Sequence, residues 1–196
     1  MHDILVLYYS HRGSVRALAE RIARGIESVP GAQARLRTVP RVSTVCEASA
    51  PDVPDRGAPY VEEADLAECI GLALGSPCRF GNMAAPMKYF WDGTIATWQN
   101  GALAGKPASV FTSSGSAHGG NESTLLAMML PLLHHGMLIV PLGYTDPGVG
   151  ATQTGGGPYG PSHLAREGVT GLPDEERDLA RHYGRMFHGI AARLAG

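Results

Sequence analysis

The sequence has few of the features that mark exported or membrane proteins. It has three cysteines in 196 residues, Cys46, Cys69 and Cys78, and this odd number without zinc-type pairing favours reduced thiols over a disulfide scaffold. The N-terminus lacks the basic flank, the long apolar stretch and the cleavage site of a secretory signal. No apolar run reaches the roughly 20 residues of a membrane-spanning helix. We therefore expect a cytoplasmic protein with no membrane span.

An excess of charge of either sign is missing too. The chain has 18 acidic and 16 basic residues, a formal net charge of −2, and no long run of like charge. The broad positive field that attracts nucleic acid or anionic lipid is therefore absent, and we expect neither as a partner. With 44% hydrophobic residues the chain can bury one core, which predicts a single domain over residues 1–196.

Short apolar runs alternate with amphipathic segments along the chain. Apolar runs bounded by glycine and proline predict strands, and apolar residues at three- and four-residue spacing predict helices. Pro131 should end or bend the helix in which it falls, and the proline-rich segment at about 40–59 is expected to be an irregular insertion. The predicted strands are 4–9, 34–39, 70–75, 107–112 and 136–142, and the main predicted helices are 15–26, 83–91, 122–133 and 174–194.

Five strands separated by helices predict an α/β fold. Right-handed crossovers leave few topologies, and we expect a flavodoxin-like doubly wound five-stranded parallel sheet in the order 2-1-3-4-5, with helices on both faces. The second strand alternates apolar residues with Arg35 and Arg37, as an edge strand does. In this strand order ligands bind at the carboxyl ends of the strands, so the loops after strands 1, 3 and 4 are the candidate site.

The first of these loops, residues 10–15, carries the parts of a phosphate site. Ser10 and Ser14 offer hydroxyls, Gly13 lets the backbone approach a ligand, and the start of a helix offers free N–H groups. The loop contains neither Gly-x-x-x-x-Gly-Lys-Ser/Thr nor Gly-x-Gly-x-x-Gly, so a nucleoside triphosphate or a dinucleotide fits poorly. A monophosphate ester such as FMN fits better. The alternative is that one of the serines only caps the helix.

The other two loops suit a flat ring and its polar edge. Residues 75–83 combine a proline, two glycines and an amide with Arg79 and Phe80, which could tune the electronics and cover the face of a flavin. An ordinary strand-to-helix turn is the alternative. Residues 112–122 are rich in serine and glycine and offer hydroxyls and N–H groups. A serine hydrolase is disfavoured because no Gly-x-Ser-x-Gly elbow is present.

Two further features could belong to a binding site. Adjacent helical histidines point to different sides, and no carboxylate stands at helical spacing, so His134-His135 does not predict a metal site. His134 could bond a flavin carbonyl or a substrate oxygen, or be a packed or surface histidine. Trp98 lies in a polar stretch, where it could form one wall of a substrate pocket or part of an oligomer interface.

Several short motifs spread along the chain are typical of one protein family. They are Leu7-Tyr8-Tyr9-Ser10 with Gly13, Arg79-Phe80-Gly81-Asn82-Met83, Trp98, Gly101-Ala102-Leu103 with Gly105-Lys106, His118-Gly119-Gly120, His134-His135-Gly136-Met137, Val140-Pro141-Leu142-Gly143-Tyr144 and Gly156-Gly157-Pro158-Tyr159-Gly160. With these motifs the chain resembles the flavodoxin-like NAD(P)H:quinone oxidoreductases of the WrbA type over nearly its full length.

The resemblance implies a function and a set of site residues. It implies FMN held without a covalent bond, NADH or NADPH as electron donor, and a quinone reduced to the hydroquinone by a ping-pong mechanism. It further implies a homotetramer with active sites near subunit interfaces, Trp98 in the substrate pocket, and His134 as the candidate catalytic group beside the flavin. The implied cofactor-binding residues are Ser10, His11, Arg12, Gly13, Ser14, Val15, Pro77, Cys78, Arg79, Phe80, Gly81, Asn82, Ser113, Ser114, Gly115, Ser116, Gly119, Gly120 and His134.

The chain departs from the family pattern at two positions. Arg12 stands where relatives often have an aromatic residue that touches the nicotinamide, and Cys78 stands where threonine is common. A guanidinium pairs well with phosphate, so Arg12 could also bind substrate by attracting the extra phosphate of NADPH. Two other classes stay open: an electron carrier, although such flavodoxins are typically strongly acidic, and a regulatory protein-binding module without turnover.

Overall fold

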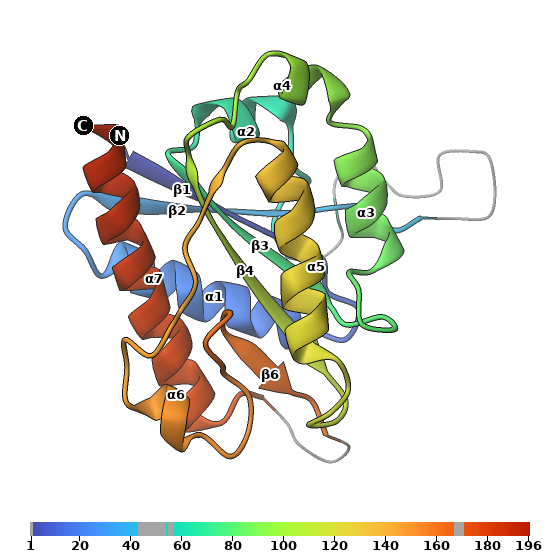
Figure 1. Cartoon of the computed structure of the whole chain (residues 1–196), viewed down its shortest axis with the longest axis vertical. Coiled ribbons are helices and arrows are strands. Elements are labelled where there is room, and N and C mark those ends of the chain that lie inside the picture. Colours follow the sequence, from blue (N-terminus) through green and yellow to red (C-terminus); the bar gives the residue numbers. More distant parts are fainter. Residues whose placement is uncertain (1, 43–53, 55–56, 167–170) are drawn as a thin grey trace.

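A parallel sheet forms the centre of the molecule (Figure 1). The computed structural model describes residues 2–42, 54, 57–166 and 171–196. The strand order is β2-β1-β3-β4-β5, and all of these neighbours pair in parallel, which confirms the predicted fold class and order. The strands are β1 (His2–Tyr8), β2 (Ala32–Thr38), β3 (Gly71–Pro77), β4 (Pro107–Ser114) and β5 (Leu138–Ile139).

Helices cover both faces of the sheet. The helices α1 and α7 pack side by side on one face, and α3 and α5 lie on the other (Figure 1). The four main predicted helices are present, whereas α2, α4 and α6 span at most six residues, too short for a periodic pattern to predict. The helices are α1 (Ser14–Glu27), α2 (Glu63–Glu68), α3 (Ala85–Asp92), α4 (Ile95–Gln99), α5 (Asn121–His134), α6 (Gly148–Ala151) and α7 (Asp174–Ala195).

The side chains of β1 show how one strand supplies two cores. Ile4 and Val6 point to the face covered by α1 and α7, and Leu5 and Leu7 point to the face covered by α3 and α5. All four are fully buried, because a central parallel strand is covered on both sides and needs no polar face. This arrangement leaves the carboxyl ends of β1, β3 and β4 at one edge of the sheet, where the three predicted loops begin.

The predicted edge strand β2 uses its arginines to cover the rim of the sheet. Arg35 contacts Asp3 at 2.7 Å and Asp65 at 3.1 Å, and Arg37 contacts Asp65 at 2.8 Å. Both arginine side chains are at least three-quarters buried. The alternating pattern therefore marked an edge strand whose charged side chains are paired.

The predicted fifth strand, residues 136–142, is wrong in its length. Instead of one strand over 136–142, β5 pairs only with Pro107 and Ala108, and a sixth strand, β6 (Ser162–Leu164), pairs with the end of β4. Pro141 has no N–H to continue the ladder, so the chain leaves the sheet there. The segment that follows carries α6 and packs Leu142 and Val149 against α7 before β6 returns.

Three further predictions can be compared with the structure. Helix α5 continues for three residues past Pro131 and ends at His134, so this proline does not end it. The expected insertion at 40–59 lies largely outside the described residues, as does Cys46. The single domain stays a prediction. Within the described part of the chain, no helix combines the length and apolar character needed to cross a membrane.

Candidate functional site

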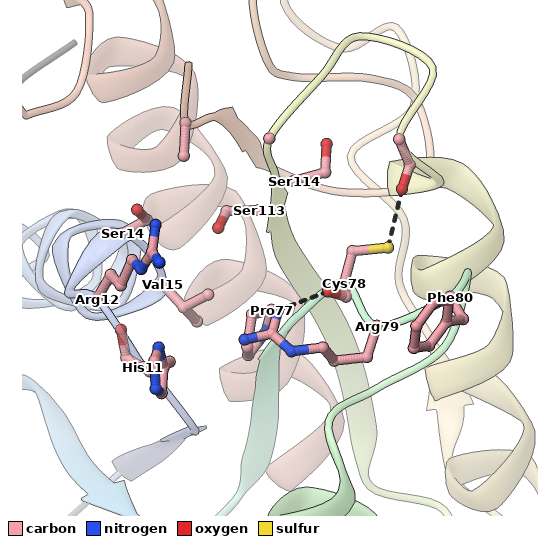
Figure 2. Close-up of a pocket in the computed structure, with 14 residues that line it drawn as sticks. His11, Arg12, Ser14, Val15, Pro77, Cys78, Arg79, Phe80, Ser113 and Ser114 are labelled. Carbon is pink, nitrogen blue, oxygen red and sulfur yellow. Dashed lines mark hydrogen bonds between the residues drawn. The ribbon is translucent and has the colours of Figure 1, made fainter. Parts of the chain in front are cut away.

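The loops after β1, β3 and β4 meet at one cavity of about 420 Å³ (Figure 2). This volume is within the range of small-molecule sites. The structure thus brings together residues from all three predicted loops at the carboxyl edge of the sheet. The cavity, called the first cavity below, is lined by Ser10, His11, Arg12, Ser14, Val15, Pro77, Cys78, Arg79, Phe80, Ser113, Ser114, Gly115, Gly119 and Ala165.

The first loop is a tight turn into α1. Ser10 Oγ accepts the N–H groups of Gly13 at 3.1 Å and Arg16 at 3.3 Å, so this serine does brace the helix start, as one of the alternatives predicted. Gly13 precedes the helix with φ of 94°, a conformation that favours glycine. Ser14 and Val15, the first two helical residues, line the cavity, and a helix has no internal acceptor for their N–H groups.

The charge around the start of α1 suits an anion. The first turn of α1 contains no acidic residue, whereas α7 begins with Asp174, Glu175 and Glu176. Acidic side chains stabilise a helix N-terminus through the helix dipole, and a bound phosphate does the same. Arg12 adds a cation to the rim, and among the described residues no acidic side chain lines the cavity. The residues present therefore fit a phosphate monoester.

The second loop exposes the aromatic ring of Phe80 to solvent. Residues 79–82 form a tight turn in which Arg79 and Asn82 exchange backbone hydrogen bonds at 2.8 and 3.1 Å, with positive φ at Phe80 (53°) and Gly81 (76°). Two positive φ angles define a type I′ turn, and a bulky residue in this conformation costs about 1–3 kcal/mol. The Phe80 ring is fully exposed. A strained backbone that displays an apolar ring is the kind of feature that ligand sites retain.

The second and third loops are fastened to each other. Cys78 N–H donates to Ser113 O at 2.9 Å, and the Cys78 thiol donates to Gly119 O at 3.0 Å (Figure 2). Ser114 Oγ donates to Ser116 O at 2.8 Å, which closes the third loop on itself. The walls of the cavity are therefore held before any ligand binds, which reduces the ordering cost of binding.

Not all of the predicted cofactor residues line this cavity. Gly13, Gly81, Ser116 and Gly120 belong to the three loops but are not among the residues that line it, and Asn82 lines a neighbouring cavity. One lining residue was not predicted: Ala165, whose N–H donates to Ser114 O at 2.8 Å where β6 pairs with β4. A strand of three residues gives too weak a pattern to be found from sequence.

His134 and Trp98 lie away from the first cavity. Gly119 and Gly120 stand at the start of α5, and His134 is its last residue, so about 20 Å of helix separates them. Trp98 Nε1 donates to His134 O at 2.9 Å, which places both residues at that far end. The family resemblance implied that both lie near the flavin, and a single chain does not bring them there.

His135, the neighbour of His134, has a structural role. It is buried, its Nε2 lies 3.0 Å from Thr94 Oγ1, and its ring packs edge-on against Trp91. Burial, together with the nearby His134, lowers the pKa of His135. The two histidines point to different sides, as the helical geometry predicted, with His134 exposed.

Sequence comparisons identify close relatives. A family model described as NADPH-dependent FMN reductase matches residues 3–145. An NAD(P)H dehydrogenase (quinone) of Geobacter sulfurreducens is 42% identical over 203 residues, covering 99% of this chain and 100% of the relative. A probable NAD(P)H dehydrogenase (quinone), FQR1-like 2, of Arabidopsis thaliana is 40% identical over 198 residues, covering 98% of this chain and 72% of the relative.

Structure comparison agrees on the fold. The crystal structure of a flavodoxin, WrbA-like protein from Agrobacterium tumefaciens matches with a TM-score of 0.71 at 22% identity, covering 98% of this chain and 99% of the other. The protein is thus a flavodoxin-like α/β protein. More narrowly, the chain belongs to the NADPH-dependent FMN reductase family, and the resemblance to flavodoxin-like NAD(P)H:quinone oxidoreductases is confirmed.

Proposed function

We propose that this protein is an FMN-dependent oxidoreductase that transfers two electrons from NADH or NADPH to a quinone by a ping-pong mechanism. Overall, one nicotinamide, one proton and one quinone give the oxidised nicotinamide and the hydroquinone. One observation carries the proposal. The first turn of α1 has no acidic residue, and it lies with Arg12 at a cavity that is formed by three loops. The two relatives are named as NAD(P)H dehydrogenases (quinone), and these names support NAD(P)H and a quinone as the substrates.

Different residues of the first cavity bind the phosphate and the ring of FMN. The N–H groups of Ser14 and Val15 with the Ser14 hydroxyl bind the FMN phosphate, without a covalent bond. The backbone of 77–80 and the third loop orient the ring. Bound FMN would supply the redox chemistry that links the nicotinamide to the quinone. The protein contributes position and electrostatics.

Anaerobic mixing of the FMN-loaded protein with NADPH and then with benzoquinone tests this function. An enzyme bleaches rapidly with the donor and recovers its colour rapidly with the quinone. An electron carrier bleaches slowly unless a reductase is added, and a regulatory module shows no turnover. Slow bleaching would assign the protein to the electron carriers, and no turnover would assign it to the regulatory modules.

A cytoplasmic location stays a prediction.

The outer face of α5 supports an oligomer, and we propose the homotetramer that the family resemblance implied. Leu126, Leu130 and Leu133 form an exposed stripe on α5, and Trp98 and Ile95 add exposed apolar side chains from α4. A helix that is apolar on all sides is normally buried, and a contiguous apolar patch normally marks an interface. Across such an interface His134 and Trp98 would serve the flavin of a neighbouring subunit.

Replacing Leu130 with aspartate tests the interface. Leu130 is 61% exposed in the subunit, so Leu130→Asp should leave the subunit folded but break the tetramer into smaller species. Size-exclusion chromatography with light scattering measures the mass. Leu194→Asp is the matched control, because Leu194 is a similarly exposed leucine (53%) on α7, across the sheet from α5. An unchanged mass for Leu130→Asp would contradict the proposed interface.

Arg12 is proposed to set the preference for NADPH. Its guanidinium lines the rim of the first cavity, and a charged hydrogen bond to the extra phosphate of NADPH is worth about 1.5–3 kcal/mol. Arg12→Ala should therefore lower the ratio of kcat/KM for NADPH to that for NADH by about tenfold or more in FMN-saturated enzyme. Arg16→Ala is the control, since Arg16 follows one turn later and faces Glu20 at 3.7 Å. An unchanged ratio for Arg12→Ala would remove this role.

A further inference from the structure

A second cavity, of about 630 Å³, adjoins the first. Four of its lining residues have no role in the function proposed above: Tyr9, Met83, Pro86 and Lys88. It lies between the carboxyl end of β1 and the start of α3. His11, Arg79 and Phe80 line both cavities, so the two share a boundary. Figure 2 shows two of these shared residues in different places, with His11 beside Arg12 and Phe80 on the opposite side of the first cavity.

The lining of the second cavity combines an apolar wall with two cations. Tyr9, Met83 and Pro86 with the exposed ring of Phe80 offer contact for a flat apolar ring. Arg79 and Lys88 supply the positive charge, and among the described residues no acidic side chain lines this cavity. This composition matches a ligand that is aromatic and anionic.

The net charge indicates how many negative charges the ligand carries. Lys88 Nζ lies 2.5 Å from Asp92 Oδ1 one helical turn away, so about one positive charge remains in excess beside the cavity. The Arg79 guanidinium donates to Cys78 O, a neutral partner, at 2.8 Å. One excess positive charge complements a carboxylate or sulfonate better than the double charge of a phosphate monoester.

We propose that the second cavity binds the anionic substituent of the electron acceptor, so that the preferred quinones are aromatic and carry one carboxylate or sulfonate. This inference rests on the proposed quinone reductase function and extends it to a substrate class. Arg79, which lines both cavities, and Lys88, which lines the second cavity and is exposed, bind the substituent. The apolar lining holds the ring system that joins the substituent to the reacting quinone.

Lys88→Met in the FMN-loaded protein is the direct test, because methionine keeps the apolar stem and removes the charge. The acceptors are a naphthoquinone sulfonate and a neutral naphthoquinone. The ratio of the KM for the anionic acceptor to that for the neutral one should rise about fivefold, which is what a partly exposed charge pair contributes. Asp92→Asn, which leaves Lys88 without its partner, should lower the same ratio.

A binding measurement without turnover completes the test. Calorimetric titration of the FMN-loaded protein with a redox-inert naphthalenesulfonate should give a dissociation constant about fivefold weaker for Lys88→Met than for the unchanged chain. Unchanged KM ratios and dissociation constants would overturn the proposal. A rise in the KM for NADPH alone would overturn it too and assign the cavity to the donor. If the proposed quinone reductase function itself were wrong, the neutral quinone would not be reduced at all. That result is distinct from an unchanged KM ratio.

Discussion

Ser14→Asp is expected to lower the affinity for FMN on the order of a hundredfold or more while the protein stays folded. Ser14 is the first residue of α1 and lines the first cavity. A carboxylate there would face the phosphate at a few ångströms, where two unit charges repel by about 4 kcal/mol at the effective dielectric constant of a protein surface. Titration of the FMN-free protein with FMN, followed by flavin fluorescence, measures the affinity.

The same substitution separates phosphate binding from helix capping. Aspartate in the first turn of a helix stabilises it by about 0.3–1 kcal/mol through the helix dipole, so the melting temperature of the FMN-free protein should hold or rise. Ser14→Asn is the neutral control and should retain most of the FMN affinity. Equal FMN binding by Ser14→Asp and Ser14→Asn would mean that the phosphate does not lie at the start of α1.

Glu176→Ala is expected to destabilise the fold by about 3–5 kcal/mol, the cost of breaking a buried charged contact. Glu176 is in the first turn of α7 and its side chain is fully buried. Its Oε2 accepts from His163 Nδ1 at 2.5 Å, and its Oε1 accepts the Gly155 N–H at 2.7 Å. Denaturant unfolding of the FMN-free protein measures the change.

The control for this prediction lies one residue away. Glu175→Ala removes the same charge from the same helical turn, but Glu175 is exposed and accepts a long hydrogen bond of 3.4 Å from Thr152, so it should cost less than about 1 kcal/mol. Similar losses for Glu175→Ala and Glu176→Ala would show that the buried contact contributes nothing beyond the helix dipole.

The stabilisation from Glu176 should also depend on pH. Burial alone would raise its pKa, but the hydrogen bond and charge of His163 and the backbone N–H donors favour the ionised form and hold the pKa below its ordinary value. A carboxyl group with a lowered pKa stabilises the fold fully above the ordinary glutamate range. That stabilisation is lost as the pH falls through the lowered value. The stability gap between the unchanged chain and Glu176→Gln should therefore narrow in acid.

The pair matters for function because of where β6 lies. His163 is the central residue of β6, which pairs with Ser113 and Ser114 at the end of β4, and Ala165 follows directly at the wall of the first cavity. Glu176 thus ties that wall to α7. Sequence patterns missed β6 altogether, since three residues give no periodicity, and the polar contact that holds it joins positions 13 residues apart.

The fold class and the order of the strands were predictable for a physical reason. The run at 4–9 is apolar on both faces because β1 is covered on both faces, and Arg35 and Arg37 alternate with apolar residues because β2 is at the edge. The three site loops were predictable because each follows a strand directly in the sequence. The resemblance placed His134 and Trp98 beside the flavin. A single chain does not bring them there, because the length of α5 separates His134 from the third loop.

The most direct test of the account is the visible spectrum of the purified protein, before and after titration with FMN. We expect the two visible absorption bands of oxidised flavin, and we expect acid precipitation to leave the flavin in solution because it is not covalently bound. A colourless protein that gains no flavin bands on titration with FMN would contradict the central claim that the three loops form an FMN site.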